Sequence, residues 1–451
     1  MRIRCKDNAS REQNKTNLFV FYDEAQLIFA YCKDNASREQ NKVNTFIFLY
    51  IFAAYIPFIC FLSVIPRIFS KFVVMKKVVI AIDSFKGCLS SEAVEQAAGE
   101  GVLSVFPQCE AVCVPVADGG EGMLDVLLLS AKGEYVTLEA SGPLMEKRMA
   151  RYGISADGRT AFIEMATISG LPLVPEDERN PMLTTTFGVG ELIADALSRG
   201  CKAFIIGLGG SATNDAGLGM LQALGFRFLD KSGQLLGTGG KILAEVASVD
   251  FSQVNPLLRG AHFKVACDVN NPFFGKNGAA HIFAPQKGAD AAMVEALDRG
   301  LQSLSRVILE ATGKDVSNLN GAGAAGGMGG GMVAFLNAVL QPGIQLLLDT
   351  IHFTDIIRDS DLIITGEGRA DKQTLMGKVP SGILEAARQQ QIPVVLIAGS
   401  ITDEALLCKA GFKGVFSITP SPMSLEEAMK PEVARRNVKG LVEQLCRILQ
   451  H

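Results

Sequence analysis

Polar and charged side chains directly follow several short apolar runs of this chain, at positions where they could act together. The residues concerned are Asp83, Ser84, Lys86, Asp118, Glu121, Ser211, Asn214, Asp215, Glu367, Arg369 and Asp371. Acids, cations and neighbouring glycine amides gathered at one place suit a site that handles phosphate groups with a divalent metal ion. Each residue alone also has an ordinary use as a helix cap, a turn residue or a solvated surface group. The prediction therefore depends on the recurrence of the pattern.

The apolar runs that precede these residues alternate with helical patterns. Lys77–Ile82 (KVVIAI) leads into a polar turn and then a helix for which Ser90 is the predicted N-cap. Ala111–Val116 (AVCVPV) leads into a second such turn and helix. This alternation predicts a parallel sheet with helices on its faces. Ligands bind outside the carboxyl ends of the strands in such sheets, so we expect the polar turns to meet in a single interdomain pocket.

The same order of apolar run and polar turn recurs later in the chain. The further runs that read as strands are Ala203–Leu208, Leu362–Thr365, Val394–Ile397 and Gly414–Ile418. Residues 135–180 alternate between apolar and polar, which predicts antiparallel hairpins. We therefore predict an α/β fold. Residues 75–135 plus 355–451 would form one domain with an open parallel sheet, and residues 136–354 an inserted mixed α/β domain.

The first 74 residues are a different kind of sequence. All 46 glycines lie after them, and the sequence CKDNASREQNK occurs at residues 5–15 and again, letter for letter, at 32–42. Residues 46–65 are almost wholly apolar and long enough to span a bilayer. We favour the interpretation that residues 1–74 are a mis-translated upstream extension and that translation starts at Met75. A membrane anchor is the alternative, and it applies only if residues 46–65 are expressed.

Composition and missing motifs exclude several classes of protein. The net charge of −4 gives no electrostatic case for nucleic acid as a partner. The cysteines form no C-x-x-C pair, and no P-loop sequence G-x-x-x-x-G-K-[ST] is present. Gly321–Gly326 matches G-x-G-x-x-G, but Lys314–Asn320 before it is not a hydrophobic strand. The glycine-rich run Gly321–Gly331 reads either as a hinge or close helix contact, or as a backbone cradle for a nucleotide.

Four stretches in order point to a family. Asp83–Gly87 (DSFKG), Pro115–Gly122 (PVADGGEG), Gly207–Gly217 (GLGGSATNDAG) and Thr365–Asp371 (TGEGRAD) resemble the bacterial type-1 glycerate kinases. Further similar stretches are Glu164–Leu171, Asn180–Ile193, Asp268–Gly275, Ala284–Gly288 and Thr374–Pro380. The resemblance covers residues 75–451 and none of residues 1–74. One departure is Ala216, where the family usually has glycine.

The resemblance implies an ATP-dependent kinase that phosphorylates D-glycerate with Mg²⁺ in the cytoplasm. It also implies two α/β domains around a cleft, one flavodoxin- or Rossmann-like and the other a distinct inserted domain. The product it implies is 2-phosphoglycerate, although some relatives are described as 3-kinases. A kinase of another small hydroxy acid is an alternative, and a non-catalytic nucleotide- or metabolite-binding protein is an alternative of another class. The sequence does not give the oligomeric state, and a homodimer is kept as an open alternative.

The residues after the apolar runs receive roles as a hypothesis. Lys86, Asp118 and Asp215 are the candidate catalytic residues, with Lys86 contacting the transferred phosphate or the substrate carboxylate and either aspartate acting as general base. The candidate substrate-binding residues are Asp83, Ser84, Ser211, Asn214 and Arg369. The candidate residues for the ATP phosphates are Gly209, Gly210, Gly326, Gly327 and Gly366. Asp268 and Glu367 are the candidate Mg²⁺ ligands.

Overall fold

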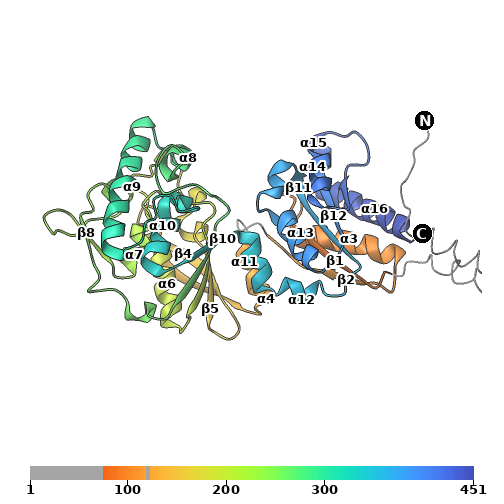
Figure 1. Ribbon diagram of the computed structural model, residues 1–451, viewed down its shortest axis with the longest axis horizontal. Coiled ribbons are helices and arrows are strands. Elements are labelled where there is room, and N and C mark those ends of the chain that lie inside the picture. The colour runs from red at the N-terminus through yellow and green to blue at the C-terminus, as the bar shows by residue number, and fades with distance from the viewer. Residues whose placement is uncertain (1–74, 118–121, 451) are drawn as a thin grey trace, which may run out of the picture. The chain divides into compact units, whose positions relative to one another are not determined.

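A parallel sheet is formed by the first and last parts of the chain, in a computed structural model that describes residues 75–117 and 122–450. Its five strands lie in the order β13-β12-β11-β1-β2 and all pair in parallel (Figure 1). The strands are β1 (Lys77–Ile82), β2 (Glu110–Cys113), β11 (Leu362–Ala370), β12 (Val394–Ile401) and β13 (Gly414–Ser417). The expected parallel sheet built from both ends of the chain is confirmed.

Helices cover both faces of this sheet. The helices of these parts of the chain are α3 (Ser91–Val105), α4 (Met123–Ser130), α11 (Gly343–Thr350), α12 (Phe353–Ile356), α13 (Val379–Gln389), α14 (Glu404–Ala410), α15 (Leu425–Ala428) and α16 (Pro431–Leu449). Of these, α3, α13 and α14 contact strands of the parallel sheet, whereas α4 and α11 contact strands of the second sheet described below. Val78, Ile80 and Ile82 of β1 pack in one apolar cluster with α3 and α16, while Val79 and Ala81 pack in a second cluster with α4, α11 and α13. Because successive side chains of a strand point to opposite faces, a continuous apolar run such as β1 is buried on both.

A six-stranded mixed sheet is formed by the middle of the chain. Its order is β10-β9-β6-β5-β4-β3. The strands are β3 (Glu134–Ser141), β4 (Lys147–Ile154), β5 (Thr160–Glu164), β6 (Ala203–Gly207), β9 (His262–Ala266) and β10 (Val339–Gln341). β4 pairs antiparallel with β3 and β5, as the alternation over residues 135–180 predicts, and the other pairs are parallel.

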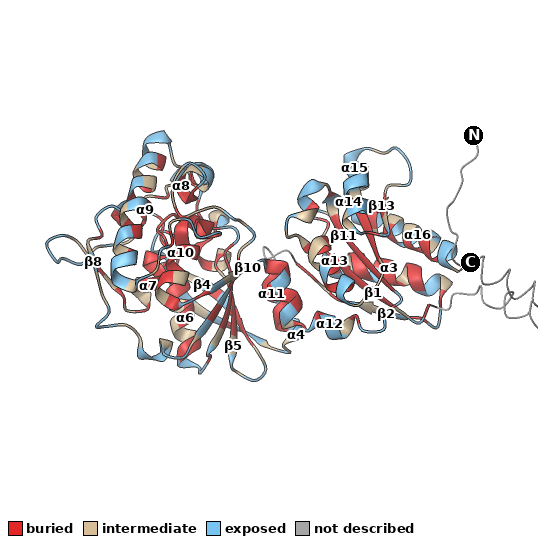
Figure 2. Ribbon diagram, viewed as in Figure 1, coloured by how far each residue is buried: buried red, intermediate tan, exposed pale blue. Residues whose placement is uncertain are grey.

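The helices α5 (Ala166–Ser169), α6 (Phe187–Ser198), α7 (Leu218–Ala223), α8 (Ala279–Phe283), α9 (Ala291–Thr312) and α10 (Ala324–Leu336) accompany the mixed sheet, with a small hairpin of β7 (Arg227–Leu229) and β8 (Ser248–Asp250). The glycine-rich run reaches into α10, which Figure 2 shows as mostly buried. A Cβ atom on Gly326 would lie 2.2 Å from the Thr213 carbonyl oxygen, and one on Gly331 would lie 2.2 Å from that of Ala216. These glycines therefore permit close packing of backbone on backbone.

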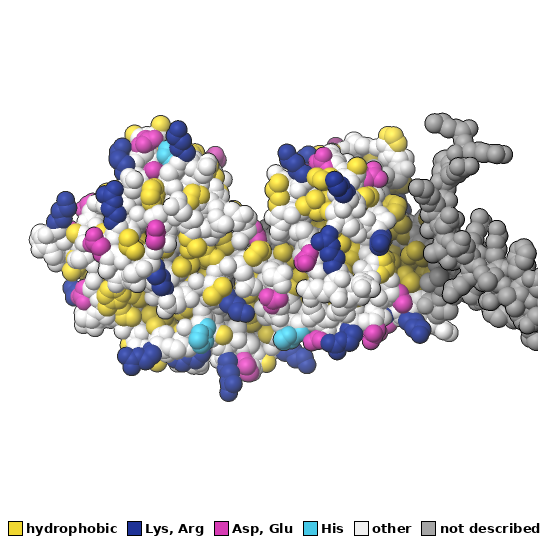
Figure 3. Space-filling model, viewed as in Figure 1, with side chains coloured by type: hydrophobic (Ala, Val, Ile, Leu, Met, Phe, Trp, Pro, Cys, Tyr) yellow, Lys and Arg dark blue, Asp and Glu magenta, His cyan; other side chains and the backbone are white. Residues whose placement is uncertain are grey.

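The domain division at residues 135 and 355 stays a prediction. Residues 74–449 form one compact unit, and a single apolar cluster contains Val79 and Ile363 of the parallel sheet together with Phe162 and Ile205 of the mixed sheet. The face in view in Figure 3 intersperses basic and acidic side chains, in keeping with the small net charge. None of the described helices is long and apolar enough to cross a membrane. The predicted apolar span at residues 46–65 lies outside the described residues.

Candidate active site

One cavity, of about 350 Å³, lies at the carboxyl ends of β1, β11 and β12. We call it the parallel-sheet cavity. The register places Ile82 beside Gly366 and Glu367 beside Ala398, so the turns after these strands end at the same edge. The sheet thereby brings together five of the predicted site residues, which all line this cavity: Asp83, Ser84, Lys86, Glu367 and Arg369.

Glu367 is the buried acid of the parallel-sheet cavity. One of its carboxylate oxygens accepts a hydrogen bond from the Thr374 hydroxyl at 2.5 Å, and the other accepts one from Lys378 Nζ at 3.1 Å. The Glu367 side chain is 7% exposed and that of Lys378 is 35% exposed. Both carboxylate oxygens are therefore engaged, and Lys378 is a further cation of the cavity.

Lys86 and Arg369 are the exposed cations of the parallel-sheet cavity. The Nε of Arg369 lies 3.4 Å from an oxygen of Asp371, but the Arg369 side chain is 69% exposed. An ion pair in so much water contributes little to stability. The guanidinium can therefore turn towards an anionic ligand at small cost, which suits a two-pronged bond to a carboxylate.

A buried carboxyl group, that of Glu95, lies beneath the turn that carries Asp83 and Lys86. One oxygen of Glu95 accepts a hydrogen bond from the Ile82 N–H at 3.2 Å and lies 3.3 Å from Ser91 Oγ, whose hydroxyl donates to the Ile82 carbonyl oxygen at 2.6 Å. Ser91 Oγ in turn accepts from the Val116 N–H at 3.3 Å. Burial raises the pKa of Glu95 to about 9. This network ties the end of β1 to the segment that follows β2.

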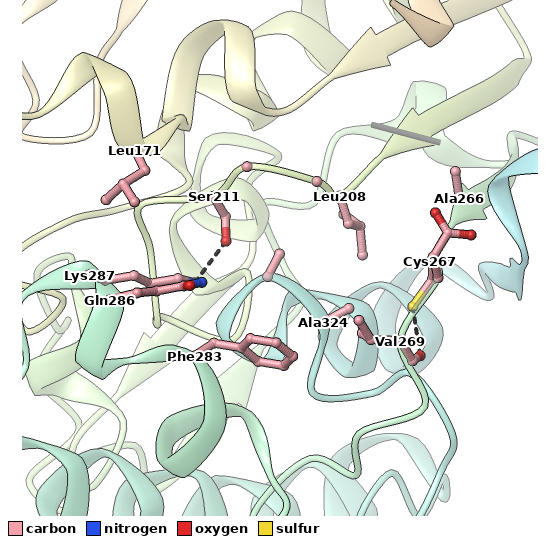
Figure 4. A pocket seen from close by; sticks show the side chains of 14 residues that line it. Leu171, Leu208, Ser211, Ala266, Cys267, Val269, Phe283, Gln286, Lys287 and Ala324 are labelled. Atoms are coloured by element: carbon pink, nitrogen blue, oxygen red, sulfur yellow. Dashed lines mark hydrogen bonds between the residues drawn. The ribbon is translucent and has the colours of Figure 1, made fainter. Parts of the chain in front are cut away.

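A second cavity, of about 460 Å³, lies at the carboxyl ends of β6 and β9. We call it the mixed-sheet cavity, and Figure 4 shows the side chains around it. Its lining residues are Leu171, Leu208, Gly209, Gly210, Ser211, Ala266, Cys267, Asp268, Val269, Phe283, Gln286, Lys287, Ala324 and Ala325. Four predicted site residues therefore meet here: Gly209, Gly210, Ser211 and Asp268.

Lys287 is a buried cation in the mixed-sheet cavity. Its side chain comes from the short helix Pro285–Lys287, and the residue is 2% exposed. Its ammonium donates hydrogen bonds to Ser211 Oγ at 2.7 Å and to the Thr213 carbonyl oxygen at 2.6 Å; Figure 4 shows the first. Burial lowers the pKa of Lys287 to about 7, and the charge of Asp215 opposes this shift.

Asp215 is wholly buried and holds its own loop together. One carboxylate oxygen accepts from the Thr186 N–H at 2.8 Å and the Thr186 hydroxyl at 2.9 Å, and the other accepts from the Gly217 N–H at 3.1 Å. Burial raises the pKa of Asp215, while these donors oppose the shift. Asp215 lines neither cavity. Its predicted role as general base stays a prediction, and the contacts give it a structural task.

The remaining predicted residues lie apart from the two linings. Gly366 is within β11, where a Cβ atom would lie 2.2 Å from the Ile397 carbonyl oxygen. Gly326 and Gly327 are buried, and Asn214 is buried with neither side-chain N nor O bonded to a described residue. Asp118 lies outside the described residues. Their predicted roles stay predictions.

Among the described residues, the predicted site residues line two cavities, and the single interdomain pocket stays a prediction. The two cavities have no lining residue in common, because Lys86 and Glu367 follow strands of one sheet while Ser211 and Asp268 follow strands of the other. Each cavity lies at the carboxyl ends of strands of its own sheet. What the sequence pattern lacks is the assignment of each strand to its sheet.

Two cavity lysines were missed by the sequence analysis. Lys287 and Lys378 follow no apolar run, so the search after strand ends passed them by. Each lies in a short stretch that is similar to the family, APQKG for Lys287 and TLMGKVP for Lys378. Those stretches were the only signal that could have identified them.

The described residues assemble no ready-made metal centre. Among residues 75–117 and 122–450, no group of three or more His, Cys, Asp or Glu side chains could hold a metal ion. Asp268 fits as a single carboxylate ligand: it lines a cavity, and one of its oxygens accepts from the Gly343 N–H at 2.8 Å. Glu367 fits less well, because both its oxygens are engaged. Mg²⁺ in phosphate-handling sites is commonly held by one or two carboxylates together with phosphates.

Comparison with known proteins identifies the family. The sequence model of the glycerate kinase family matches residues 78–450 of this chain. Glycerate 2-kinase of Escherichia coli K12 is 45% identical over 372 residues, which cover 82% of this chain and 95% of that protein. Glycerate kinase of Bacillus subtilis 168 is 46% identical over 355 residues, which cover 78% and 93%. A crystal structure from Salmonella typhimurium LT2, whose protein is assigned as glycerate kinase 2, matches with a TM-score of 0.75 at 43% identity and covers 83% of this chain and 98% of that one. This chain belongs to the glycerate kinase family.

Proposed function

We propose that this protein transfers the terminal phosphoryl group of ATP to the 2-hydroxyl of D-glycerate, giving 2-phosphoglycerate and ADP. The observation that carries the proposal is the 45% identity to a glycerate 2-kinase over 95% of that protein. The chemistry of the described cavities supports it, because each combines acids with cations at strand ends. Phosphoryl transfer needs positioning and charge neutralisation more than covalent chemistry.

The residues of the parallel-sheet cavity would bind and orient the hydroxy acid. Arg369 would hold its carboxylate, with Lys86 close to the transferred phosphoryl group. Of the two aspartates considered as general base, Asp215 is fully buried with both oxygens accepting hydrogen bonds. We therefore place that role on Asp118, which lies in the similar stretch PVADGGEG.

Mg²⁺ would be the metal cofactor of the reaction and would neutralise charge on the nucleotide phosphates. Asp268 is the described carboxylate that fits it best. For Glu367 to serve as a ligand, its bonds to Lys378 or Thr374 would have to be exchanged. A cytoplasmic location and a homodimer also belong to the proposal.

Phosphorus and carbon NMR of the product formed from D-glycerate, ATP and Mg²⁺ tests this function. We expect 2-phosphoglycerate as the only phosphorylated acid. Formation of 3-phosphoglycerate would show that the primary hydroxyl, and not the 2-hydroxyl, is phosphorylated. If glycolate, lactate or tartronate is turned over faster than D-glycerate, that acid is the substrate. If ATP binds but no acid is phosphorylated, the protein is a nucleotide-binding protein and not a kinase.

A further inference from the structure

The mixed-sheet cavity contains a buried cation with bonding capacity to spare. An ammonium group has three N–H donors. Lys287 gives one to Ser211 Oγ and one to the Thr213 carbonyl oxygen. The third remains, and Lys287 lines the cavity while being only 2% exposed. Placing a lysine in such a position costs desolvation free energy, which a bound anion would offset.

The turn beside Lys287 adds backbone donors. No described residue accepts a hydrogen bond from the backbone N–H of Gly209, Gly210 or Ser211, and all three residues line the cavity. Gly210 has a φ of +73°, the left-handed conformation that glycine adopts without strain. Successive N–H groups in a turn with one left-handed residue form a concave anion site.

The Ser211 hydroxyl supplies one more donor. Its oxygen accepts the bond from Lys287, and no described residue accepts its own proton. This part of the mixed-sheet cavity therefore offers the Lys287 ammonium, the Ser211 hydroxyl and the turn amides as hydrogen-bond donors. These donors outnumber those that the two oxygens of a carboxylate need, and they suit the three oxygens of a terminal phosphate. The one acid of the lining, Asp268, is also bonded to the Gly343 N–H.

We infer that Lys287, Ser211 and the Gly209–Gly210 turn form a phosphate-binding subsite that holds the terminal phosphates of the nucleotide. That the phosphates come from a nucleotide rests on the proposed function; the anion chemistry itself does not. Lys287 is then a phosphate-binding residue of the mixed-sheet cavity. The parallel-sheet cavity, with its exposed guanidinium, is left for the hydroxy acid.

Calorimetric titration of the full chain with ADP, inorganic triphosphate and D-glycerate tests the inference. Lys287→Met keeps the length of the side chain and removes its charge. We expect it to weaken ADP and triphosphate binding by roughly tenfold to a hundredfold, the effect of losing one hydrogen bond to a charged group. D-Glycerate affinity should stay within about twofold.

Lys314→Met is the matched control. Lys314 is a half-buried lysine whose ammonium, like that of Lys287, donates to backbone carbonyl oxygen, here of Val333 and Ala334, but it lines neither cavity. We expect its ADP affinity to equal that of the wild type. If Lys287→Met does not fold, Ser211→Ala serves instead and should weaken triphosphate binding several-fold, by about one neutral hydrogen bond.

Two results would overturn the subsite. One is unchanged ADP and triphosphate affinity in a folded Lys287→Met or, in its place, Ser211→Ala variant. The other is loss of D-glycerate affinity with ADP affinity retained, which would show that Lys287 and the turn bind the carboxylate of D-glycerate. Failure of the proposed function looks different: the wild type would bind triphosphate through Lys287 and yet not phosphorylate D-glycerate.

Discussion

The two cavities hold their cations in opposite ways. In the parallel-sheet cavity, Lys86 and Arg369 are exposed and Lys378 is paired with Glu367. In the mixed-sheet cavity, Lys287 is buried and bonded to two oxygens. A unit charge at 4 Å interacts with another by about 1 kcal/mol in water and by about 4 kcal/mol at the lower effective dielectric near a protein. The exposed cations can adapt to an arriving ligand, whereas the buried one is preorganised.

The largest effect is expected at an exposed cation. Lys86→Ala should lower kcat by about 10²-fold or more, because the proposed transition state loses a charge near the transferred phosphoryl group. Steady-state kinetics with D-glycerate and ATP measures this. Lys413→Ala is the control: Lys413 is also exposed and precedes β13 of the same sheet, but does not line the cavity. Near-normal kcat in folded Lys86→Ala would remove Lys86 from the catalytic residues.

The next prediction contrasts two aspartates, one expected to affect the free energy of unfolding and the other kcat. Asp215→Asn turns an amide N–H₂ towards the donors on Thr186 or Gly217, so the free energy of unfolding should fall by about 2–3 kcal/mol. Asp118→Asn should lower kcat by about 10²-fold without a comparable loss of stability. Urea titration and kinetics on both variants measure the contrast. An Asp215→Asn protein as stable as the wild type but with kcat reduced a hundredfold would make Asp215 the better candidate for the general base.

The two regions should also differ in how their stability depends on pH. The pKa of Glu95 is raised by burial from 4.5 to about 9, so between these values the folded chain keeps a proton that the unfolded chain has lost. The contribution of Glu95 is complete below pH 4.5 and is lost as the pH rises through 9. The pKa of Lys287 is lowered by burial from 10.5 to about 7, so the unfolded chain holds the extra proton there, and stability rises with pH across that window.

Two variants separate these opposing slopes. Of these two groups, Glu95 is the one that titrates below about pH 6, so Glu95→Gln should remove a fall in the free energy of unfolding of roughly 1 kcal/mol per pH unit. Above about pH 9 the contribution of Lys287 exceeds that of Glu95, so Lys287→Met should remove a rise of similar size. Urea titrations at pH 5, 6, 9.5 and 10.5 measure both. Wild-type slopes retained in either variant would contradict the assignment for that residue.

The sequence predicted the elements better than their assembly. Strand ends were marked by an apolar run followed by glycine and acid, as at Ile82 and at Gly207, because a buried parallel strand must be apolar on both faces. The cap at Ser90 followed from local chemistry, and its side chain accepts from the Ala93 N–H at 3.3 Å. Such features depend on neighbours along the chain, which one sequence displays.

Features that depend on distant packing were not predictable in the same way. Glu95 lies near the start of a helix and its local sequence carries no sign of burial, yet it is buried, with Ile82 and Ser91 as hydrogen-bond partners. Lys287 reads as a surface lysine, yet it reaches the loop at Ser211, 76 positions earlier in the chain. Burial and partner are decided by the tertiary fold, and local composition contains neither.

The smallest effect concerns Ala216, in the loop between β6 and α7. Its φ is +54°, in the left-handed region that costs an alanine roughly 1–2 kcal/mol. Ala216→Gly removes that strain but loses a buried methyl group and adds chain entropy to the unfolded state. We expect a net gain of about 0.5 kcal/mol or less by urea titration. Ala212→Gly, in the same loop, buried and without a positive φ, should instead lose about 1 kcal/mol. Equal losses in both variants would show that the strain at Ala216 is fully compensated by its packing against the glycine-rich run of α10.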